Sequence, residues 1–144
     1  MMDILICKMQ YPNDPTNNNG VHQHFVGFFD GNKLVLYSIS STLGKEYKVF
    51  AKDGSYNPDY FILSNGYEIA CGLRASSFID CTKGYVLNLR AGVNISRLSN
   101  RKIPNNIRKE ILNKIEMKKK EGKYTEYIID INAFIANNPR LKTI

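Results

Sequence analysis

The stretch Val21–Lys45, VHQHFVGFFDGNKLVLYSISSTLGK, organises the fold predicted for this chain. Two apolar runs, Phe25–Phe29 and Leu34–Ile39, flank the turn sequence DGN at positions 30–32. An Asp-Gly pair between apolar runs is a strong signal for a β-hairpin. The hairpin would bring the start of the first run, with its histidines, beside the end of the second run, with its hydroxyl groups.

Pairing across this hairpin predicts which side chains meet. A tight turn places residues opposite each other when their numbers sum to about 62. His24 would then face the region of Ser38, and His22 would face that of Ser40. A one-residue bulge would change the partner of each histidine but not its neighbourhood.

Further short strands are predicted on either side of the hairpin. An Asn-Gly pair at positions 65–66 lies between two apolar runs and predicts a second hairpin. The segments Gln10–Gly20 and Lys52–Asp59 are rich in turn-forming residues and predict loops. The expected strands are Asp3–Met9, Tyr47–Ala51, Tyr60–Ser64, Tyr67–Cys71, Ser76–Asp80 and Gly84–Leu89.

Helices are expected in the last third of the chain. Apolar residues recur there at helical spacing, which predicts one amphipathic helix over Pro104–Glu121. Asp130 suits the N-cap of a shorter helix, Ile131–Asn137. The segment Tyr124–Ile129 between these two fits either a strand or a helix.

Together these elements predict an α+β fold, a small and strongly curled antiparallel β-barrel with the C-terminal helices packed outside. A chain of 144 residues is long enough for one such domain, 1–144, with a real core. No apolar span is long enough for a transmembrane helix. The start of the chain is interpreted as the first strand rather than as a signal peptide, because Asp3 and Lys8 interrupt its apolar run.

The chain is basic, with 20 Lys and Arg against 13 Asp and Glu and a net charge of +7. This balance favours a polyanionic partner, either nucleic acid or an anionic membrane surface, although many soluble proteins simply have a basic surface. Cys7, Cys71 and Cys81 are odd in number and form no CxxC pair, so neither a disulfide framework nor a zinc site is expected. Small buried residues in a reduced, cytoplasmic environment are the simpler interpretation.

His22 and His24 are the first candidates for chemistry. Their side chains share one face of the expected strand, because strand side chains alternate. The pair lacks a third histidine as a ligand, so no metal or cofactor is expected. Imidazole titrates near neutral pH, which makes at least one of the two a candidate general acid or base.

The hydroxyl groups of Ser38, Ser40, Ser41 and Thr42 form the second candidate set. Hydroxyls at a strand end commonly cap the strand or form turns. Opposite two histidines they also suit the oxygens of a phosphate group. No GxSxG elbow, P-loop or GxGxxG fingerprint surrounds them, so a hydrolase nucleophile or a nucleotide-binding loop is not supported.

Basic residues near this region suggest contacts to a phosphate backbone. Lys45 directly follows the hydroxyl residues, and a lysine beside a transferring phosphoryl group would stabilise its developing charge. Together with Tyr11, Tyr47, Tyr56 and Tyr60, the basic end of the expected helix suits backbone contacts and base stacking on RNA. The candidate RNA-binding residues are Lys33, Thr42, Arg74, Arg97, Lys118, Lys119 and Lys120.

The order of these segments is similar to that of a known family. The chain has a DILI strand, a loop, GVHQHFVGFF, a strand ending in SISST, the segment GLRASSFIDC, and ISRLSNRKI before a helix. In this order it resembles the MazF/PemK-like endoribonuclease toxins, and most nearly their ToxN and CptN relatives from RNA-inhibited (type III) toxin–antitoxin systems. The resemblance covers roughly Asp3–Ile115.

This resemblance implies an SH3-like barrel with helices and metal-independent cleavage of single-stranded RNA. The ribose 2′-hydroxyl would attack the adjacent phosphorus and leave a 2′,3′-cyclic phosphate and a 5′-hydroxyl. The family's basic residue would fall at His22 or His24, its Thr/Ser pair at Ser40 and Ser41, and the lysine of the ToxN-like branch at Lys45. Histidine stands where arginine is usual in MazF-like members, so the division of acid, base and charge-stabilising roles stays open.

The expected activity is therefore that of a toxin endoribonuclease with His22, His24, Ser40, Ser41 and Lys45 as catalytic residues. An RNA antitoxin is the preferred inhibitor and a protein antitoxin the alternative, with an oligomer assembled around the antitoxin as one option. A non-catalytic RNA-binding or protein-interaction module on the same barrel is the alternative from another class. The two classes differ in whether the histidines and serines converge on one accessible pocket.

Overall fold

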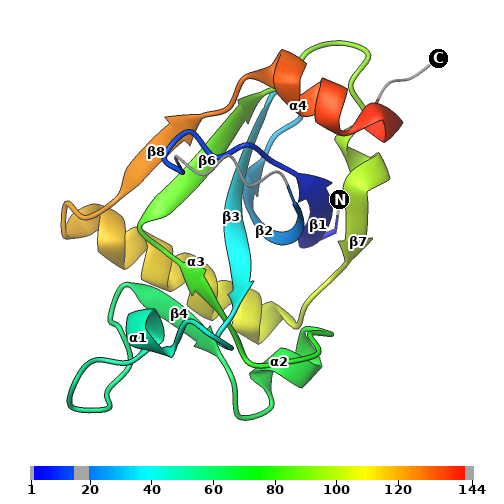
Figure 1. Cartoon of the computed structure of the whole chain (residues 1–144). Coiled ribbons are helices and arrows are strands. Elements are labelled where there is room, and N and C mark those ends of the chain that lie inside the picture. The colour runs from blue at the N-terminus through cyan, green and yellow to red at the C-terminus, as the bar shows by residue number, and fades with distance from the viewer. Residues whose placement is uncertain (1, 15–19, 142–144) are drawn as a thin grey trace.

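The computed structural model describes residues 2–14 and 20–141, which form an α+β fold (Figure 1). Within these residues no helix is long and apolar enough to cross a membrane. The strands are β1 (Ile4–Lys8), β2 (Val21–Phe29), β3 (Lys33–Ser41), β4 (Tyr60–Leu63), β5 (Ser77–Asp80), β6 (Lys83–Asn88), β7 (Ser99–Arg101) and β8 (Thr125–Ile128). The helices are α1 (Glu46–Val49), α2 (Tyr67–Ala70), α3 (Asn105–Lys120) and α4 (Ile131–Asn137), with short 3₁₀ turns at Ile95–Leu98 and Pro139–Leu141.

The hairpin of β2 and β3 is confirmed, and β3 is the central strand of the sheet. His24 pairs with Ser38, as the summed residue numbers predict. The register then shifts between Val26 and Phe28, and a Cβ atom at Gly27 would lie 2.3 Å from the Tyr37 ring. Glycine at this bulge therefore lets the Tyr37 ring lie against the backbone of β2.

The other edge of β3 is covered by two successive strands. β6 pairs with the first half of β3, from Lys33↔Asn88 to Leu36↔Tyr85, and β5 pairs with the second half, from Ile39↔Ile79 to Ser41↔Ser77. β5 pairs in turn with β4, and β6 pairs with β8 in parallel. β3 therefore reaches beyond the end of its pairing with β2 while β5 supports it from the other side.

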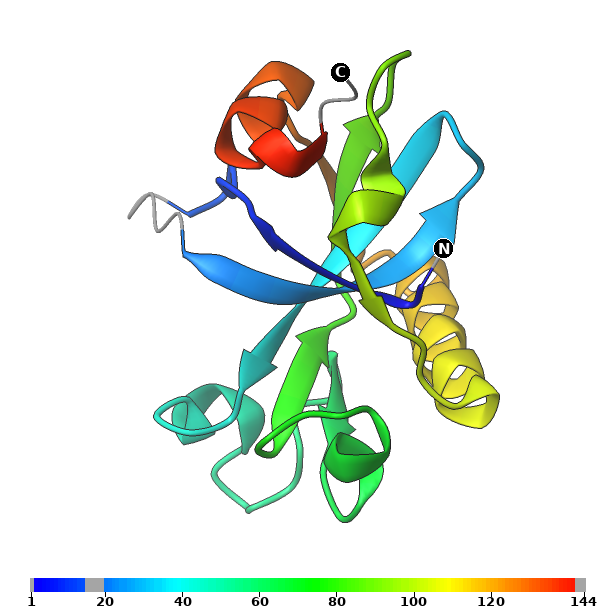
Figure 2. The ribbon, with the colours of Figure 1, turned by 90° about the vertical axis from the view of Figure 1, so that its right-hand side faces the viewer.

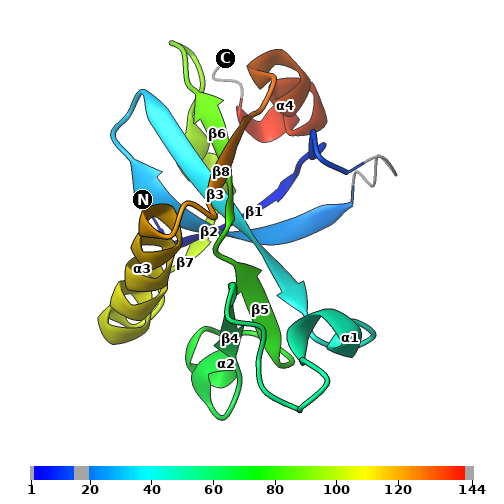
Figure 3. The same ribbon diagram turned by 90° about the vertical axis from the view of Figure 1, so that its left-hand side faces the viewer.

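β2 and β3 diverge beyond His24 and Ser38, where their pairing ends (Figures 2 and 3). β2 continues as the partner of β1, with Cys7↔His22 as one pair. β3 continues as the partner of β5. The divergence leaves a wedge between the last residues of β3 and the first residues of β2.

Two apolar clusters hold the sheet, one on each face. The cluster beneath α3 contains Phe25 and Tyr37 from the hairpin together with Ile107, Ile111 and Ile115. The cluster beneath α4 contains side chains that alternate with these along the strands, such as Val26 and Leu36, packed with Phe134 and Ile135. Since both faces are covered, the hairpin strands are continuously apolar rather than alternating.

Most predicted elements agree with the structure. The long helix is α3, the short helix is α4 with its Asp130 cap, and the ambiguous segment 124–129 contains the strand β8. The sheet is antiparallel except for the β6–β8 pair, and its strands do not close into a barrel among the described residues. The predicted closed barrel is therefore replaced by an open, strongly twisted sheet.

Two predicted strands are short helices instead. The segment Tyr47–Ala51 contributes to α1, and Tyr67–Cys71 contains α2, so the hairpin predicted at Asn65-Gly66 does not form. Asn65 and Gly66 do adopt positive φ angles of 56° and 101°, as such a turn requires. The edge that β4 would offer to a hairpin partner is used by β5 from farther along the chain, because tertiary pairing overrides the local turn signal.

Candidate functional site

The wedge between β2 and β3 contains a cleft of about 430 Å³. Its walls come from the ends of both hairpin strands, the 11–14 loop, α1 and the β4–β5–β6 region. Its lining residues are Tyr11, Asn13, Asp14, His22, Ser38, Ile39, Ser40, Lys45, Lys48, Tyr60, Phe78, Asp80, Lys83 and Tyr85. The cleft exists because β3 turns toward β5 where β2 stays with β1.

Three of the five predicted catalytic residues meet in this cleft, namely His22, Ser40 and Lys45. His22 is half-buried near the start of β2, and Ser40 is half-buried near the end of β3. Lys45 is exposed and stands just before α1. An imidazole, a hydroxyl and an ammonium group therefore border one accessible space.

Ser41 and Thr42 do not join this group. Ser41 lies on the opposite face of β3 from Ser40, because strand side chains alternate. It lines a second hollow, of about 470 Å³, with His22, Arg74 and Arg101, so His22 borders both the cleft and this hollow. The Thr42 hydroxyl instead donates a hydrogen bond to the Ser76 carbonyl, at 3.2 Å, which extends the pairing of β3 with β5.

His24 is also absent from the cleft, so the predicted pocket with both histidines is wrong. Its side chain is fully buried, with Nε2 2.6 Å from the Tyr11 hydroxyl and Nδ1 3.4 Å from the Cys7 thiol. Burial, together with the nearby charge of His22, lowers the pKa of His24 from 6.5 to about 3. The two histidines do share a face of β2, but only His22 lies beyond the paired part of the hairpin.

Burial also raises the pKa of the Cys7 thiol to about 12, so that Cys7 stays protonated. His24 therefore bridges two neutral groups, and it is a structural residue that fixes the position of Tyr11. The Tyr11 ring lies with its centroid 6.4 Å from that of His22 and 4.8 Å from that of Tyr85. Through Tyr11, the buried network reaches the wall of the cleft.

Positive charge in the cleft comes from three lysines, Lys45 and Lys48 at α1 and Lys83 on β6. Lys83 donates a hydrogen bond of 2.8 Å to Asp80. Burial alone would lower the pKa of Lys83, but the hydrogen bond and charge of Asp80 outweigh it and raise this pKa. Lys83 therefore stays charged, but Asp80 offsets its charge, and Asp14 is a second carboxylate in the lining. The attraction of the cleft for an anion comes from Lys45 and Lys48.

Aromatic rings form another part of the cleft wall. The rings of Tyr60 and Phe78 are stacked, with centroids 4.6 Å apart and planes 19° apart. Burial raises the pKa of Tyr60, so its hydroxyl stays protonated and can donate a hydrogen bond. Lysines next to aromatic rings are the combination found where proteins bind single-stranded nucleic acid.

The remaining predicted RNA-binding residues do not line the cleft. Lys33 stands at the turn end of β3, and Arg74 lines the second hollow with Ser41. Arg97 donates to the Arg140 carbonyl at 3.2 Å. The other three candidates, Lys118, Lys119 and Lys120, form the last turn of α3. Lys119 pairs with Glu116, Lys120 is exposed, and Lys118 is buried.

Lys118 is thus a packing residue rather than a surface charge. Only 3% of the residue is exposed, and its ammonium lies 2.9 Å from Glu121 and 3.2 Å from Asp59. The hydrogen bond to Glu121 is the main cause of its raised pKa. Lys118 therefore fastens the end of α3 to the loop before β4.

Several cleft residues were not among the predicted site residues. Tyr11 and Tyr60 were expected to stack on bases, but Lys48, Phe78, Asp80, Lys83 and Tyr85 carried no local signal. Phe78, Asp80, Lys83 and Tyr85 reach the cleft because β5 and β6 pair with β3 across about forty residues of sequence, and Lys48 reaches it on α1. A different long-range pairing, that of β7 with β1, brings Arg101 to the second hollow.

Comparisons with known proteins assign no family to this chain. It matches no protein-family model, and no curated protein has a significantly similar sequence. Among the described residues, no group of three or more His, Cys, Asp or Glu side chains is placed to hold a metal ion. The function is therefore argued from the cleft itself.

Proposed function

We propose that the chain is an endoribonuclease that cleaves single-stranded RNA in the cleft between β2 and β3. The observation that carries the proposal is the convergence of His22, Ser40 and Lys45 on one accessible space with further lysines around it. A hydroxyl and ammonium groups suit phosphate oxygens, and an imidazole transfers protons near neutral pH. The stacked rings of Tyr60 and Phe78 add a surface for a base.

In the proposed reaction, His22 accepts the proton of the ribose 2′-hydroxyl as that oxygen attacks phosphorus. The bond from phosphorus to the 5′-oxygen of the next nucleotide breaks, and this oxygen takes up one proton, which the Lys45 ammonium can supply. Ser40 donates a hydrogen bond to a phosphate oxygen, and the lysines stabilise the negative charge that develops on phosphorus. The products are a 2′,3′-cyclic phosphate and a 5′-hydroxyl, and no metal takes part.

We further propose that this nuclease is the toxin of a toxin–antitoxin system with an RNA antitoxin. The proposal rests on the resemblance of the chain's segment order to that of ToxN-like toxins and on its net charge of +7. A folded RNA inhibitor would be recognised by the same basic cleft. Purification from cells that express the neighbouring genes tests it: a short repeated RNA supports an RNA antitoxin, whereas an acidic protein supports a protein antitoxin.

The cleavage proposal is tested with His22→Ala. Removal of an acid/base group slows catalysis by about 10²–10⁴-fold, whereas RNA binding by the lysines and aromatic rings should survive. Cleavage of single-stranded RNA is measured with EDTA present, the product ends are identified, and affinity is measured with an oligonucleotide that lacks the 2′-hydroxyl groups. The control is Asn88→Ala, a replacement on the same sheet but away from the cleft, because Asn88 is exposed at the end of β6 and pairs with Lys33.

Undiminished cleavage by folded His22→Ala would remove His22 from the mechanism. Loss of wild-type cleavage in EDTA would contradict a metal-independent reaction. RNA binding by wild type without any cleavage would favour the second candidate, a non-catalytic RNA-binding module. That candidate draws support from the presence of a single accessible histidine in the cleft, since His24 is buried.

A further inference from the structure

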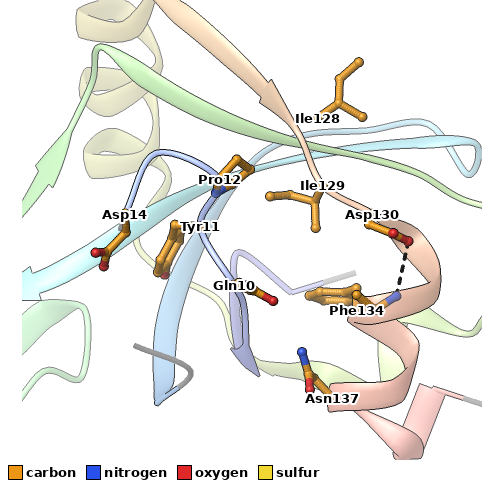
Figure 4. Close-up of a pocket in the computed structure, with 10 residues that line it drawn as sticks. Gln10, Tyr11, Pro12, Asp14, Ile128, Ile129, Asp130, Phe134 and Asn137 are labelled. Atoms are coloured by element: carbon orange, nitrogen blue, oxygen red, sulfur yellow. Dashed lines mark hydrogen bonds between the residues drawn. The ribbon is translucent and has the colours of Figure 1, made fainter. Parts of the chain in front are cut away.

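A separate hollow of about 380 Å³ adjoins the cleft on the other side of Tyr11 and Asp14. It lies between the 10–14 loop, the end of β8 and α4, and Figure 4 shows Ile129, Phe134 and Asn137 facing that loop across it. Apolar side chains form most of its wall: Tyr11, Pro12, Ile128, Ile129, Ala133 and Phe134. Its volume and mainly apolar wall are typical of a pocket for a small organic group.

The polar groups of this hollow differ from those of the cleft, except that the Asp14 carboxylate lines both. The carboxamides of Gln10 and Asn137 stand at its wall, and no Lys or Arg lines it within the described part of the chain. The Asp130 carboxylate is occupied as the cap of α4, where it accepts hydrogen bonds from the backbone N–H groups of Asn132 and Ala133 at 2.9 and 3.3 Å. With the Asp14 carboxylate in its wall the hollow disfavours an anion and suits an uncharged group that donates hydrogen bonds, whereas the lysines of the cleft suit an anion.

We infer that this hollow is a base pocket, which holds the base of a nucleotide whose phosphate lies in the cleft. The inference rests on the proposed function in taking RNA as the ligand. The flat apolar faces of a base suit walls such as Pro12, Ile129 and Phe134, and a carboxamide offers both donors and acceptors to a base edge. The pocket would thus select which base stands next to the cleaved bond.

The wall between pocket and cleft is well fixed. The Tyr11 hydroxyl is held by His24 at 2.6 Å, and its ring packs on Tyr85 with centroids 4.8 Å apart. On the cleft side, the centroid of the Tyr11 ring lies 6.4 Å from that of His22. Tyr11 therefore lines both the pocket and the cleft that holds the proposed proton acceptor, so one nucleotide could place its base in the pocket and its phosphate in the cleft.

Filling the pocket with Ala133→Leu tests the inference. Titrations of the four nucleoside 3′-monophosphates and of inorganic phosphate are followed by calorimetry with wild type and variant, so that no turnover is needed. Loss of one stacked base weakens binding by roughly 5- to 150-fold, and we expect a loss in this range for nucleotides, with the affinity for inorganic phosphate unchanged. Ala136→Leu, exposed on the same helix and outside the pocket, is the matched control and should change neither affinity.

A second variant, Asn137→Leu, keeps the size of the side chain but removes its hydrogen-bonding groups, and it should reduce the differences in affinity among the four nucleotides. Equal nucleotide binding by wild type and Ala133→Leu, with both folded, would overturn the base pocket even if RNA is cleaved. Selective loss of nucleotide binding in Ala133→Leu would uphold the pocket even if wild type cleaves no RNA. The base pocket and the proposed catalysis are thus tested by different results.

Discussion

At the scale of single residues, neighbouring histidines have different roles because burial changes within two positions of β2. His24 is enclosed by Cys7 and Tyr11 and has its pKa lowered from 6.5 to about 3, mainly by burial. Below about pH 6.5 the unfolded chain therefore binds a proton that the folded chain does not, and stability falls as the pH falls toward 3. Above pH 6.5 neither the folded nor the unfolded chain binds this proton, so the burial of His24 then causes no loss of stability.

We therefore expect His24→Gln to weaken this pH dependence, because glutamine retains a hydrogen-bonding group for Tyr11 but does not titrate. One such proton accounts for a slope of up to about 1.4 kcal/mol per pH unit in the free energy of unfolding. Urea denaturation of wild type and His24→Gln between pH 7 and 4.5 measures the difference, with the values at pH 7 as the internal reference. Parallel curves for the two proteins would show that His24 takes up its proton without loss of the fold.

At the scale of elements, α3 is held to the sheet by its apolar face and by one buried charge near its end. Lys118 reaches Asp59 and Glu121, whose side chains stay partly exposed at 36% and 38%. The two ion pairs of Lys118 are more buried than a surface ion pair and less buried than an interior one, and their contribution to stability should be intermediate. Lys118→Gln should therefore lower the free energy of unfolding by about 1 kcal/mol. Lys120→Gln, the same change on an exposed residue of the same helix turn, is the control.

Urea denaturation of both variants at neutral pH measures this difference, and RNA affinity is measured in parallel. If Lys118→Gln weakens RNA binding without any loss of stability, Lys118 contacts the ligand and the structural role assigned to it is wrong. Equal stability of the two variants would show that α3 does not depend on this charge.

At the scale of the whole molecule, the net charge of +7 is distributed over the surface, but three lysines gather in the cleft. RNA affinity should fall steeply as the salt concentration rises. Each lysine that no longer neutralises a phosphate should make the negative slope of log K against log salt less steep by roughly 0.7 for a single strand. The double variant Lys48→Gln/Lys45→Gln should therefore flatten the slope. Lys102→Gln/Lys109→Gln removes the same charge from exposed positions outside the cleft and should leave the slope nearly unchanged.

Binding of an uncleavable oligonucleotide at several salt concentrations distinguishes the two cases. Equal flattening by both double variants would mean that RNA responds to the overall charge of the surface rather than to the cleft. In that case the lysines of the cleft would have no special part in binding.

Features that depend on neighbours along the chain could be predicted from the amino-acid sequence. The turn at Asp30, the pairing of His24 with Ser38, the helix α3 and the Asp130 cap of α4 all follow from local turn chemistry, spacing and capping. Local alternation also separates Ser40 from Ser41, although the prediction placed both in one pocket.

The surroundings of these elements, in contrast, depend on the tertiary structure. The pairing of β6 with β3 brings Lys83 to the cleft, and the pairing of β4 with β5 brings Tyr60. The Tyr11 loop closes over His24 and leaves His22 at the wedge. These contacts join residues that are distant along the chain, and they are set by which edges and faces remain unpaired once the sheet has formed. Residue type and spacing therefore predicted the candidate groups, whereas long-range strand pairing and burial determined which of them share an accessible site.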